Sequence, residues 1–324
     1  EIVDDPSKAC TKGILYTTYP RLAEDVPIGS DILIDDGSVD LSVTGAEDGR
    51  LICRVMNEGV IKGHKSVNVP NVHINLPAVT EKDRRFIEWA IKADIDFIAH
   101  SFVRSAKDLL EIQEILDAHK SHLKIISKIE NQQGIDNLDD ILTYSYGVMV
   151  ARGDLGVEIP AERIPLVQRD VVKACRARKK PVIIATQMLQ SMIDNPRPTR
   201  AEVTDVANAI FQSADAIMLS GESAFGKYPV EAVKTMTSIA LQTEQALDVN
   251  LELDLRKAIK PVAVVLARSL VAATQELPVK ALIFDTYTGR VGRYLSTFRP
   301  KVPIYAMCYN SYTMRELALV FGIN

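Results

Sequence analysis

The sequence predicts an α/β fold built on a parallel sheet, and three observations support this. Between residues 80 and 246 a short apolar strand, a loop and an amphipathic helix recur as a unit. The strands are nearly unbroken apolar runs, as in Val182-Ile183-Ile184-Ala185, which is typical of a sheet covered by helices on both faces. No G-x-G-x-x-G follows any strand, which argues against a dinucleotide-binding fold. The predicted strands are 96–102, 124–129, 147–151, 181–186 and 216–219.

Five consecutive strand–helix units favour a (β/α)8 barrel or a doubly wound sheet. Three positions predict helix starts. Thr80 and Asp83 have the spacing of a capping box, Ser105 precedes a helical pattern, and Thr199 with Glu202 forms a second box.

Residues 1–78 differ from this pattern and predict a small all-β module. Apolar and polar residues alternate on both sides of Asp35-Asp36-Gly37, which is a turn signal. The alternation returns at residues 51–55, before a second turn at Asn57-Glu58-Gly59. No long helical pattern interrupts it.

The C-terminal part predicts a small α/β domain. A polar connection at 247–260 leads to a helix at 262–274, a strand at 280–284, a helix around Tyr294 and a strand at 302–307. The chain therefore divides into an all-β domain (1–78), a βα domain (79–246) and a C-terminal α/β domain (247–324).

The composition excludes several classes of protein. A net charge of -4 and an isoelectric point near 5.8 give no basic excess for nucleic acid or an anionic membrane. The apolar runs are too short to span a bilayer. The cysteines lie far apart, without zinc spacing, and we expect free thiols in a cytoplasmic protein. They are Cys10, Cys53, Cys175 and Cys308.

Candidate catalytic residues follow the strands, where the active site of a parallel barrel lies. Lys128 and Glu130 are two residues apart on one strand, so their side chains face the same way. Asp154 follows the next strand. Two carboxylates with little His or Cys nearby favour a hard cation such as Mg²⁺. The alternative is a buried Lys–Glu ion pair that closes the barrel.

Four motifs occur in order on successive strands: Ser-Lys-Ile-Glu-Asn, Ala-Arg-Gly-Asp-Leu-Gly-Val-Glu, Ala-Thr-Gln-Met-Leu and Met-Leu-Ser-Gly-Glu-Ser. Together with Leu-Pro-Ala-Val-Thr-Glu-Lys-Asp before them, they resemble the pyruvate kinase family over essentially the whole chain. The resemblance implies a (β/α)8 TIM-type barrel with an inserted all-β lid and a C-terminal α/β effector domain. It also implies phosphoryl transfer from phosphoenolpyruvate to ADP, giving pyruvate and ATP in the last step of glycolysis.

The resemblance assigns roles to the strand-end residues. Lys128 would stabilise the transferring phosphoryl group and the enolate. Glu130 and Asp154 would hold Mg²⁺ or Mn²⁺. Backbone N–H groups near Arg152, Gly153 and Asp154 would receive the substrate carboxylate at a helix start.

Thr186 would lie over the methylene carbon, in the path of proton delivery. Its alternative is a strand-end threonine that bonds its own backbone. Ser101 resembles a residue near the family's potassium site, so K⁺ is expected as a second cation. His100 departs from the family and is given no role.

Two further groups of residues are implied away from the strand ends. Asp36 and Lys65 belong to the lid, whose closure would exclude water around the nucleotide, although Asp36 fits a simple turn equally well. Thr286, Thr288, Gly289 and Arg290 resemble an effector-phosphate loop, or form an ordinary turn between strand and helix.

The resemblance also implies that the chain is truncated at both ends, because the family's barrel begins with three strands before the lid. The complete protein would be a homotetramer. The segment alone is expected to be inactive and poorly soluble, because an open barrel exposes sheet edges. Two other functions remain open: a catalytically inactive fragment, or a Mg²⁺-dependent lyase acting on a pyruvate enolate.

Overall fold

The computed structural model describes residues 1–324 except 4, 6, 7, 9, 12, 36, 62, 64, 73, 75, 250 and 252–259. The described residues form two compact units. The first comprises Glu1–Ala78 and Gly153–Ile164, and the second comprises Val79–Arg152 and Pro165–Asn324. The expected residue Asp36 and most of the expected polar connection at 247–260 lie outside the described residues. The three-domain division stays a prediction.

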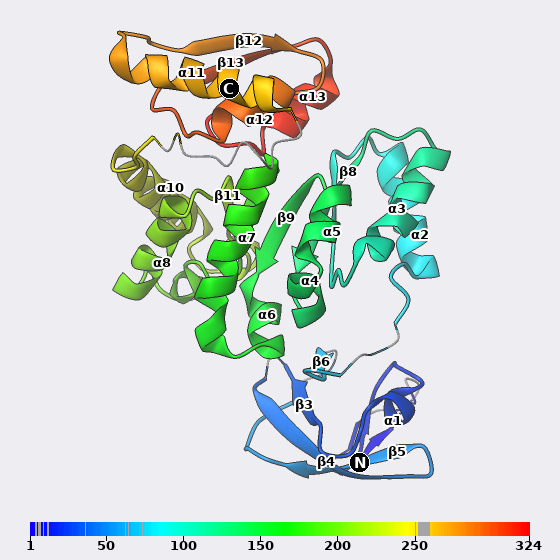
Figure 1. The fold of residues 1–324 in the computed structure, drawn as a ribbon. Coiled ribbons are helices and arrows are strands. Elements are labelled where there is room, and N and C mark those ends of the chain that lie inside the picture. The colour runs from blue at the N-terminus through cyan, green and yellow to red at the C-terminus, as the bar shows by residue number, and fades with distance from the viewer. Residues whose placement is uncertain are drawn as a thin grey trace. The chain divides into compact units, whose positions relative to one another are not determined.

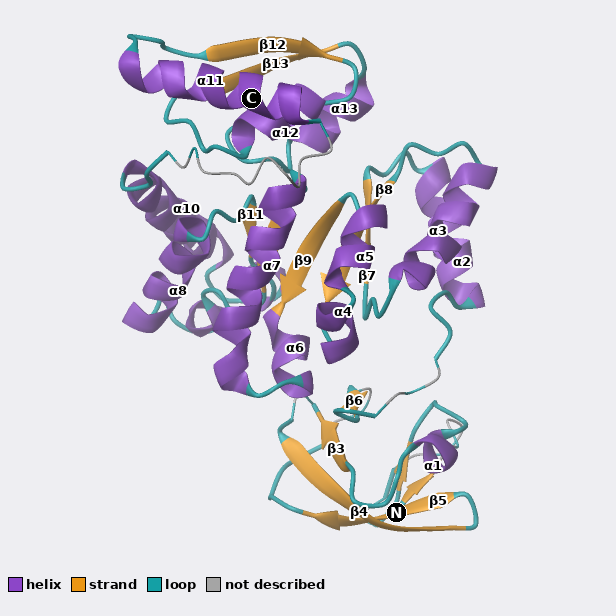
Figure 2. Cartoon of the chain, in the orientation of Figure 1, coloured by secondary structure: helices purple, strands orange, loops and turns teal. Residues whose placement is uncertain are grey.

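The first unit contains a six-stranded sheet in the order β2-β1-β5-β4-β3-β6, with one short helix, α1 (Leu22–Asp25). Figure 2 shows mainly strands and loops in this part of the chain. Every pairing is antiparallel except that of β1 with β2. The strands are β1 (Ile2–Val3), β2 (Leu15–Tyr16), β3 (Asp31–Ile34), β4 (Val39–Glu47), β5 (Arg50–Val55) and β6 (Val67–Asn68).

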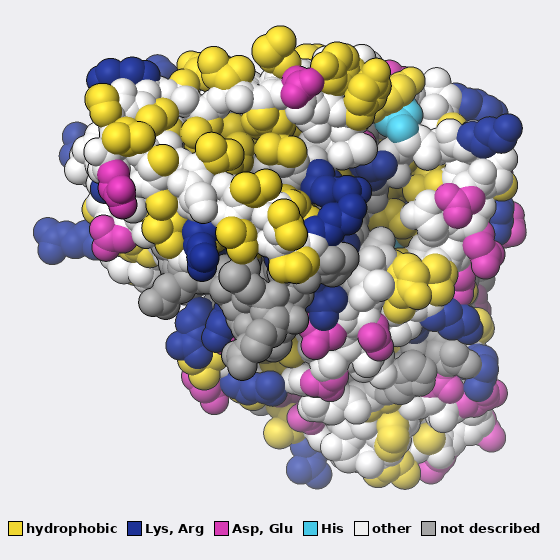
Figure 3. Space-filling model, turned by 45° about the horizontal axis from the view of Figure 1, so that its top comes forward, with side chains coloured by type: hydrophobic (Ala, Val, Ile, Leu, Met, Phe, Trp, Pro, Cys, Tyr) yellow, Lys and Arg dark blue, Asp and Glu magenta, His cyan; other side chains and the backbone are white. Residues whose placement is uncertain are grey.

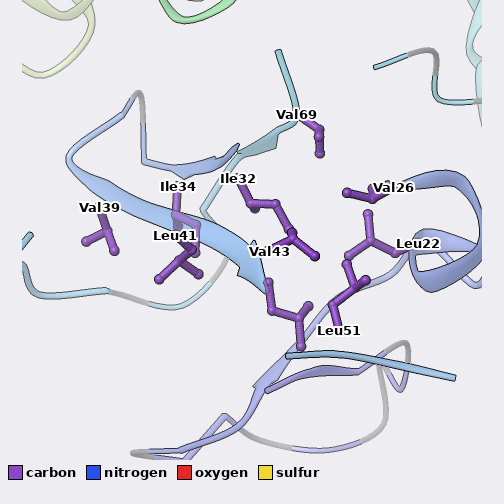
Figure 4. Close-up of a cluster of buried hydrophobic side chains, with 10 residues drawn as sticks. Leu22, Val26, Ile32, Ile34, Val39, Leu41, Val43, Leu51 and Val69 are labelled. Carbon is purple, nitrogen blue, oxygen red and sulfur yellow. The ribbon is translucent and has the colours of Figure 1, made fainter. Parts of the chain in front are cut away.

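Alternation along these strands builds the core of the first unit. Ile32 pairs with Leu41, and both side chains are buried because opposed residues share a face of the sheet. Val43 and Leu51 add to the same cluster, whose side chains converge in Figure 4. The expected β pattern is confirmed, and the Asp35–Gly37 segment links β3 to β4 as expected.

The second unit is organised by a five-stranded sheet in the order β11-β10-β9-β8-β7, and every pairing is parallel. Figure 1 shows helices alternating with these strands along the chain. The strands are β7 (Phe97–His100), β8 (Lys124–Ile129), β9 (Gly147–Ala151), β10 (Val182–Ala185) and β11 (Ala216–Met218). The five predicted strand–helix units are therefore present.

Three strands end earlier than the sequence predicts. The expected strand 96–102 stops at His100, the expected strand 181–186 stops at Ala185, and the expected strand 216–219 stops at Met218. After the first two strands the backbone turns into the left-handed region, with φ of 51° at Phe102 and 68° at Thr186. All three early ends lie at the candidate site.

The helix caps follow the sequence. The Thr80 hydroxyl accepts a hydrogen bond from the Asp83 N–H at 3.1 Å, and the Thr199 hydroxyl accepts one from the Glu202 N–H at 3.2 Å.

The helices that accompany the five-stranded sheet are α2 (Glu81–Lys92), α3 (Ala106–Ala118), α4 (Gln132–Asp136), α5 (Leu138–Tyr144), α6 (Arg152–Glu158), α7 (Ile164–Arg178), α8 (Arg200–Phe211), α9 (Gly221–Ala224) and α10 (Pro229–Gln245), with 3-10 turns η1 (Ala161–Arg163) and η2 (Gln190–Ile193).

The C-terminal part of the second unit has a two-stranded parallel sheet of its own. Its core includes Val271, Phe298 and Ile304. It contacts the five-stranded part through an ion pair between Arg299 and Asp215, 3.0 Å apart. Its elements are α11 (Pro261–Glu276), β12 (Leu282–Thr286), α12 (Arg290–Ser296), β13 (Ile304–Cys308) and α13 (Ser311–Leu317).

In the part of the chain that the structure describes, no helix is both long and apolar enough to cross a bilayer.

Candidate functional site

The candidate site begins where the parallel strands end, because the carboxyl ends of all five strands meet at one edge of the sheet. The residues just after each strand carry most of the expected chemistry. They are Ser101 and Phe102 after β7, Glu130 after β8, Arg152 after β9, Thr186 after β10 and Ser220 after β11.

Lys128 and Glu130 form the centre of this edge. The Lys128 Nζ lies 2.6 Å from the Glu130 Oε1, so the two side chains face the same way, as their spacing predicts. Glu130 has an exposed fraction of 0%, whereas the Lys128 side chain is 22% exposed. The lysine also donates a hydrogen bond to the Ser101 hydroxyl at 3.1 Å. The pair is thus a buried carboxylate facing a partly accessible ammonium group.

The backbone after β7 holds the second oxygen of Glu130. The Phe102 N–H donates to the Glu130 Oε2 at 2.6 Å, and Phe102 has a φ of 51°. Such a φ is uncommon for a bulky residue and is found where the surrounding structure imposes it. The carboxylate is therefore fixed from two strands at once, which orients it for binding.

Asp154 lies in the first turn of α6 and belongs to the first compact unit. Its pairing with Glu130 stays a prediction. Among the described residues no cluster of three or more His, Cys, Asp or Glu groups is arranged to hold a metal. The expected donors are carboxylate oxygens alone, and hard oxygens are the ligands that Mg²⁺ prefers. In this chemical respect the expected pair fits the metal.

Thr186 follows β10 in a strained conformation. Its φ is 68°, and that of Gln187 is 53°, so two successive residues occupy the left-handed region. For a β-branched residue this costs on the order of 1–3 kcal/mol. The Thr186 hydroxyl donates to the Ala185 carbonyl at 2.6 Å. This is the bond expected of a strand-end threonine, and it does not by itself test a role in catalysis.

The Arg152 side chain explains how that conformation is held. Its Nη2 donates to the Thr186 carbonyl at 2.7 Å, and its Nη1 contacts both carboxylate oxygens of Asp205, at 2.8 and 2.6 Å. Arg152 is buried. The guanidinium group therefore serves the architecture, and the predicted substrate contact concerns the backbone N–H groups of residues 152–154.

Two residues that hold the site, Asp205 and Glu222, received no role in the sequence analysis. Asp205 lies within α8 and carries no motif. Glu222, inside the Ser-Gly-Glu-Ser motif, has an exposed fraction of 0% and accepts the N–H groups of Leu189 at 3.0 Å and Ser220 at 2.8 Å. It links the loops after β10 and β11.

His100 ends β7, and burial lowers the pKa of its imidazole. This favours the neutral ring at physiological pH, in keeping with the absence of an assigned role. In the all-β unit the Lys65 Nζ forms an ion pair with the Asp35 carboxylate at 2.8 Å. The lid roles expected for Lys65 and Asp36 stay predictions.

The expected effector loop is closed by its own hydroxyl. Thr286 Oγ1 accepts from the N–H groups of Thr288, at 3.3 Å, and Gly289, at 2.9 Å. Gly289 has a φ of 67°, and a Cβ there would lie 2.8 Å from the Leu317 Cδ2, so only glycine fits. Two N–H groups that a phosphate would need are already engaged. Arg290 follows as the first residue of α12.

Comparison with known proteins identifies the family to which the chain belongs. The model of the pyruvate kinase barrel domain matches residues 2–233, and that of the pyruvate kinase alpha/beta domain matches residues 265–324. The chain belongs to the pyruvate kinase family. This membership confirms the resemblance and the fold class expected from the sequence.

Pyruvate kinases of known sequence and structure are similar along the whole chain. The chain is 49% identical to a pyruvate kinase of Geobacillus stearothermophilus over 328 aligned residues, covering 100% of this chain and 55% of that protein. It is 50% identical to one of Borreliella burgdorferi, covering 95% of this chain and 65% of that protein. A crystal structure of a Cryptosporidium parvum pyruvate kinase superposes with a TM-score of 0.91 at 38% identity, covering 100% of this chain and 68% of that one. The chain thus spans between about half and two thirds of these two sequence relatives.

Proposed function

We propose that the chain carries part of the active site for phosphoryl transfer from phosphoenolpyruvate to ADP, giving pyruvate and ATP. The observation that carries the proposal is the Lys128 ammonium group, held 2.6 Å from the buried Glu130 carboxylate at the strand-end edge of a pyruvate kinase family barrel. The lyase alternative receives no support from the comparisons.

Lys128 is the residue that acts on the moving charge. An oxygen of the ADP terminal phosphate attacks the phosphorus of phosphoenolpyruvate, and the bond from that phosphorus to the enol oxygen breaks. The electron pair of the broken bond leaves an enolate. A fixed ammonium group stabilises both the transferring phosphoryl group and this enolate, because its positive charge and N–H donors are in place before the negative charge moves. Glu130 and Ser101 set the direction of the lysine side chain.

The expected cations fit the oxygen groups nearby. Glu130 and Asp154 would hold Mg²⁺ or Mn²⁺, which supplies charge neutralisation across the substrate oxygens when bound. K⁺ would lie near Ser101, whose hydroxyl already accepts a hydrogen bond from Lys128.

The remaining site residues bind and protonate the product enolate. The N–H groups of Arg152, Gly153 and Asp154 start helix α6 and would receive the substrate carboxylate. Thr186 would lie over the methylene carbon, in the path by which a proton reaches it to complete pyruvate. Arg152 acts as a positioning residue, because its side chain fixes the carbonyl of Thr186.

Several wider expectations belong to the same proposal. They are an all-β lid with Lys65 and Asp36 over the nucleotide, a phosphorylated effector at Thr286–Arg290, a homotetrameric assembly and a place in cytoplasmic glycolysis. What supports them is the family membership. The free thiols at Cys10, Cys53, Cys175 and Cys308 are consistent with a reducing compartment.

Two assays on protein from the gene's full reading frame test the function. A coupled assay measures pyruvate formed from phosphoenolpyruvate and ADP, and nuclear magnetic resonance measures exchange of the pyruvate methyl protons with deuterated water. We expect both reactions, each dependent on Mg²⁺. Exchange without phosphoryl transfer would point to the lyase alternative, and loss of both would point to an inactive protein. Either result would overturn the proposal.

A further inference from the structure

A basic cavity lies at the end of the sheet opposite the candidate active site. Its volume is about 410 Å³, and it is lined from the starts of three strands: Lys124 begins β8, Tyr146 precedes β9 and Lys180 precedes β10. Arg290 and Arg293 of α12 line it from the C-terminal part of the chain. The cavity therefore joins two parts of the second unit and is separate from the strand-end site.

The lining of the basic cavity is strongly cationic. It has six Lys or Arg side chains and neither Asp nor Glu. In the space-filling view, Lys and Arg side chains gather near the middle of the visible face (Figure 3). The six cationic residues are Lys124, Arg178, Lys179, Lys180, Arg290 and Arg293.

Carboxylates outside the cavity compensate only two of these charges. Arg178 pairs with Asp139 at 2.7 Å, but the Asp139 side chain is 84% exposed, so the pair is weak. Lys124 lies 3.5 Å from a Glu316 oxygen. Within the part of the chain that the structure describes, the other four cations form no ion pair with a carboxylate.

Three of those four cations are held by neutral groups. The Lys179 and Lys180 ammonium groups donate to the backbone carbonyls of Ala177 and Ser145. The Arg293 guanidinium lies over the Tyr146 ring, with its carbon 5.6 Å from the ring centroid. Its Nη1 is buried and has no hydrogen-bond partner among the described residues.

The lowered pKa of the Lys180 ammonium group agrees with an excess of positive charge in the basic cavity. Burial, together with the charges of Arg178 and Arg293, lowers the pKa of this ammonium group to about 8, although Cys175 acts in the opposite direction. A lysine in contact with an acidic partner would have its pKa raised instead. The basic cavity therefore lacks the negative charge that its side chains would stabilise.

We propose that the basic cavity binds the phosphoryl group of a small phosphorylated molecule and so ties α12 to the starts of β8 and β10. Two guanidinium groups and two ammonium groups suit phosphate oxygens, which accept several charge-assisted hydrogen bonds at once. A volume of about 410 Å³ also leaves room for an organic part beyond the phosphate. The basic cavity shares Arg290 with the expected Thr286–Arg290 loop, and it differs from that loop because its other cations come from α12 and from the strand starts of the sheet.

Isothermal titration calorimetry on protein from the gene's full reading frame tests the proposal, with inorganic phosphate and glycerol 3-phosphate as probes. We expect saturable binding of at least one probe and a dissociation constant at least tenfold higher in Arg293→Gln. Arg178→Gln is the second variant, because Arg178 lies at the surface and its loss threatens folding least. Lys107→Gln, an exposed change on α3 outside the cavity, is the matched control and should bind as the parent does.

The two probes identify the source of the phosphate. Equal affinities indicate a site for free phosphate, and tenfold tighter binding of glycerol 3-phosphate indicates that the organic part is also bound. Absence of saturable binding would overturn the proposal. It would also be overturned if Lys107→Gln weakened binding as much as Arg293→Gln, because the effect would then follow total charge.

Sulfate gives an independent readout, since it does not titrate between pH 7 and pH 9.5. Its affinity should fall over this range as Lys180 loses its proton. The other titratable side chains around Lys180 do not hide this loss of sulfate affinity. Guanidinium groups carry their charge throughout this pH range. Burial raises the pKa of Tyr146 to about 12 and also raises the pKa of Cys175, so both groups stay neutral.

The variant Lys180→Gln should remove most of this pH dependence. Lys179, whose pKa is also lowered by burial, supplies the remainder, and Lys124 stays outside the argument as the partner of Glu316. An unchanged pH profile in Lys180→Gln would contradict the assignment of the site to this cavity.

Discussion

Replacing Lys128 by Met separates the two roles that its ion pair could play. The substitution keeps an unbranched side chain of similar length but removes the charge facing Glu130. The Glu130 Oε1 then loses a counter-ion at 2.6 Å, while its Oε2 keeps the Phe102 N–H at 2.6 Å. The carboxylate remains fully buried, so the change leaves a charge that water does not reach.

The structure sets the size of the effect on stability. Removing one partner of a buried ion pair costs about 3–5 kcal/mol. Two features favour a smaller value here: the Lys128 side chain is 22% exposed, and Glu130 retains a backbone donor. We therefore expect the free energy of unfolding to fall by roughly 2–3 kcal/mol, and a domain with about 5–15 kcal/mol of stability stays folded after such a loss.

The effect on catalysis should be much larger than the effect on folding. Phosphoryl transfer should fall by about 10³-fold or more, because a preorganised charge at the transition state is lost. Exchange of the pyruvate methyl protons should survive better, since no phosphoryl group moves in that reaction. Urea unfolding followed by circular dichroism measures the first quantity, and the coupled and exchange assays measure the second.

The double variant Lys128→Met/Glu130→Gln is the control. The amide still accepts the Phe102 N–H but carries no charge, so at least half of the lost stability should return while phosphoryl transfer stays low. Near-parental turnover in Lys128→Met would refute the catalytic role. A double variant as unstable as the single one would refute the ion-pair account of stability.

Three other changes test the remaining site residues. Glu130→Gln and Asp154→Asn should each raise the Mg²⁺ concentration for half-maximal activity about tenfold, because each removes a charged oxygen ligand; an unchanged Mg²⁺ titration in both would exclude the pair. Thr288→Glu should abolish activation by a phosphorylated effector through charge repulsion, and a normal response would leave the loop as an ordinary turn. Arg152→Lys should lower the free energy of unfolding by about 2 kcal/mol, since a lysine does not contact Asp205 and the Thr186 carbonyl together; equal urea midpoints would contradict this.

Local pattern predicted the main strands of the fold and several helix starts. Alternation around Asp35–Gly37 predicted the antiparallel strands, and apolar runs predicted the five parallel strands. The boxes at Thr80 and Thr199 predicted helix starts. These features depend on residues two to four positions apart, and that is the range over which side-chain periodicity and capping act. The facing of Lys128 and Glu130 has the same origin.

The surroundings of these residues follow from long-range packing. Arg152 meets Asp205 from 53 residues away, and the left-handed turn at Thr186 depends on that contact. Arg293 reaches a cavity that Lys180 lines from a distant part of the chain. The spacing of neighbouring residues does not predict such long-range contacts, because they depend on how strands and helices pack once formed. The order of residues thus placed chemical groups at the strand ends. Long-range packing selected their partners, held the strain at Thr186 and formed the basic cavity.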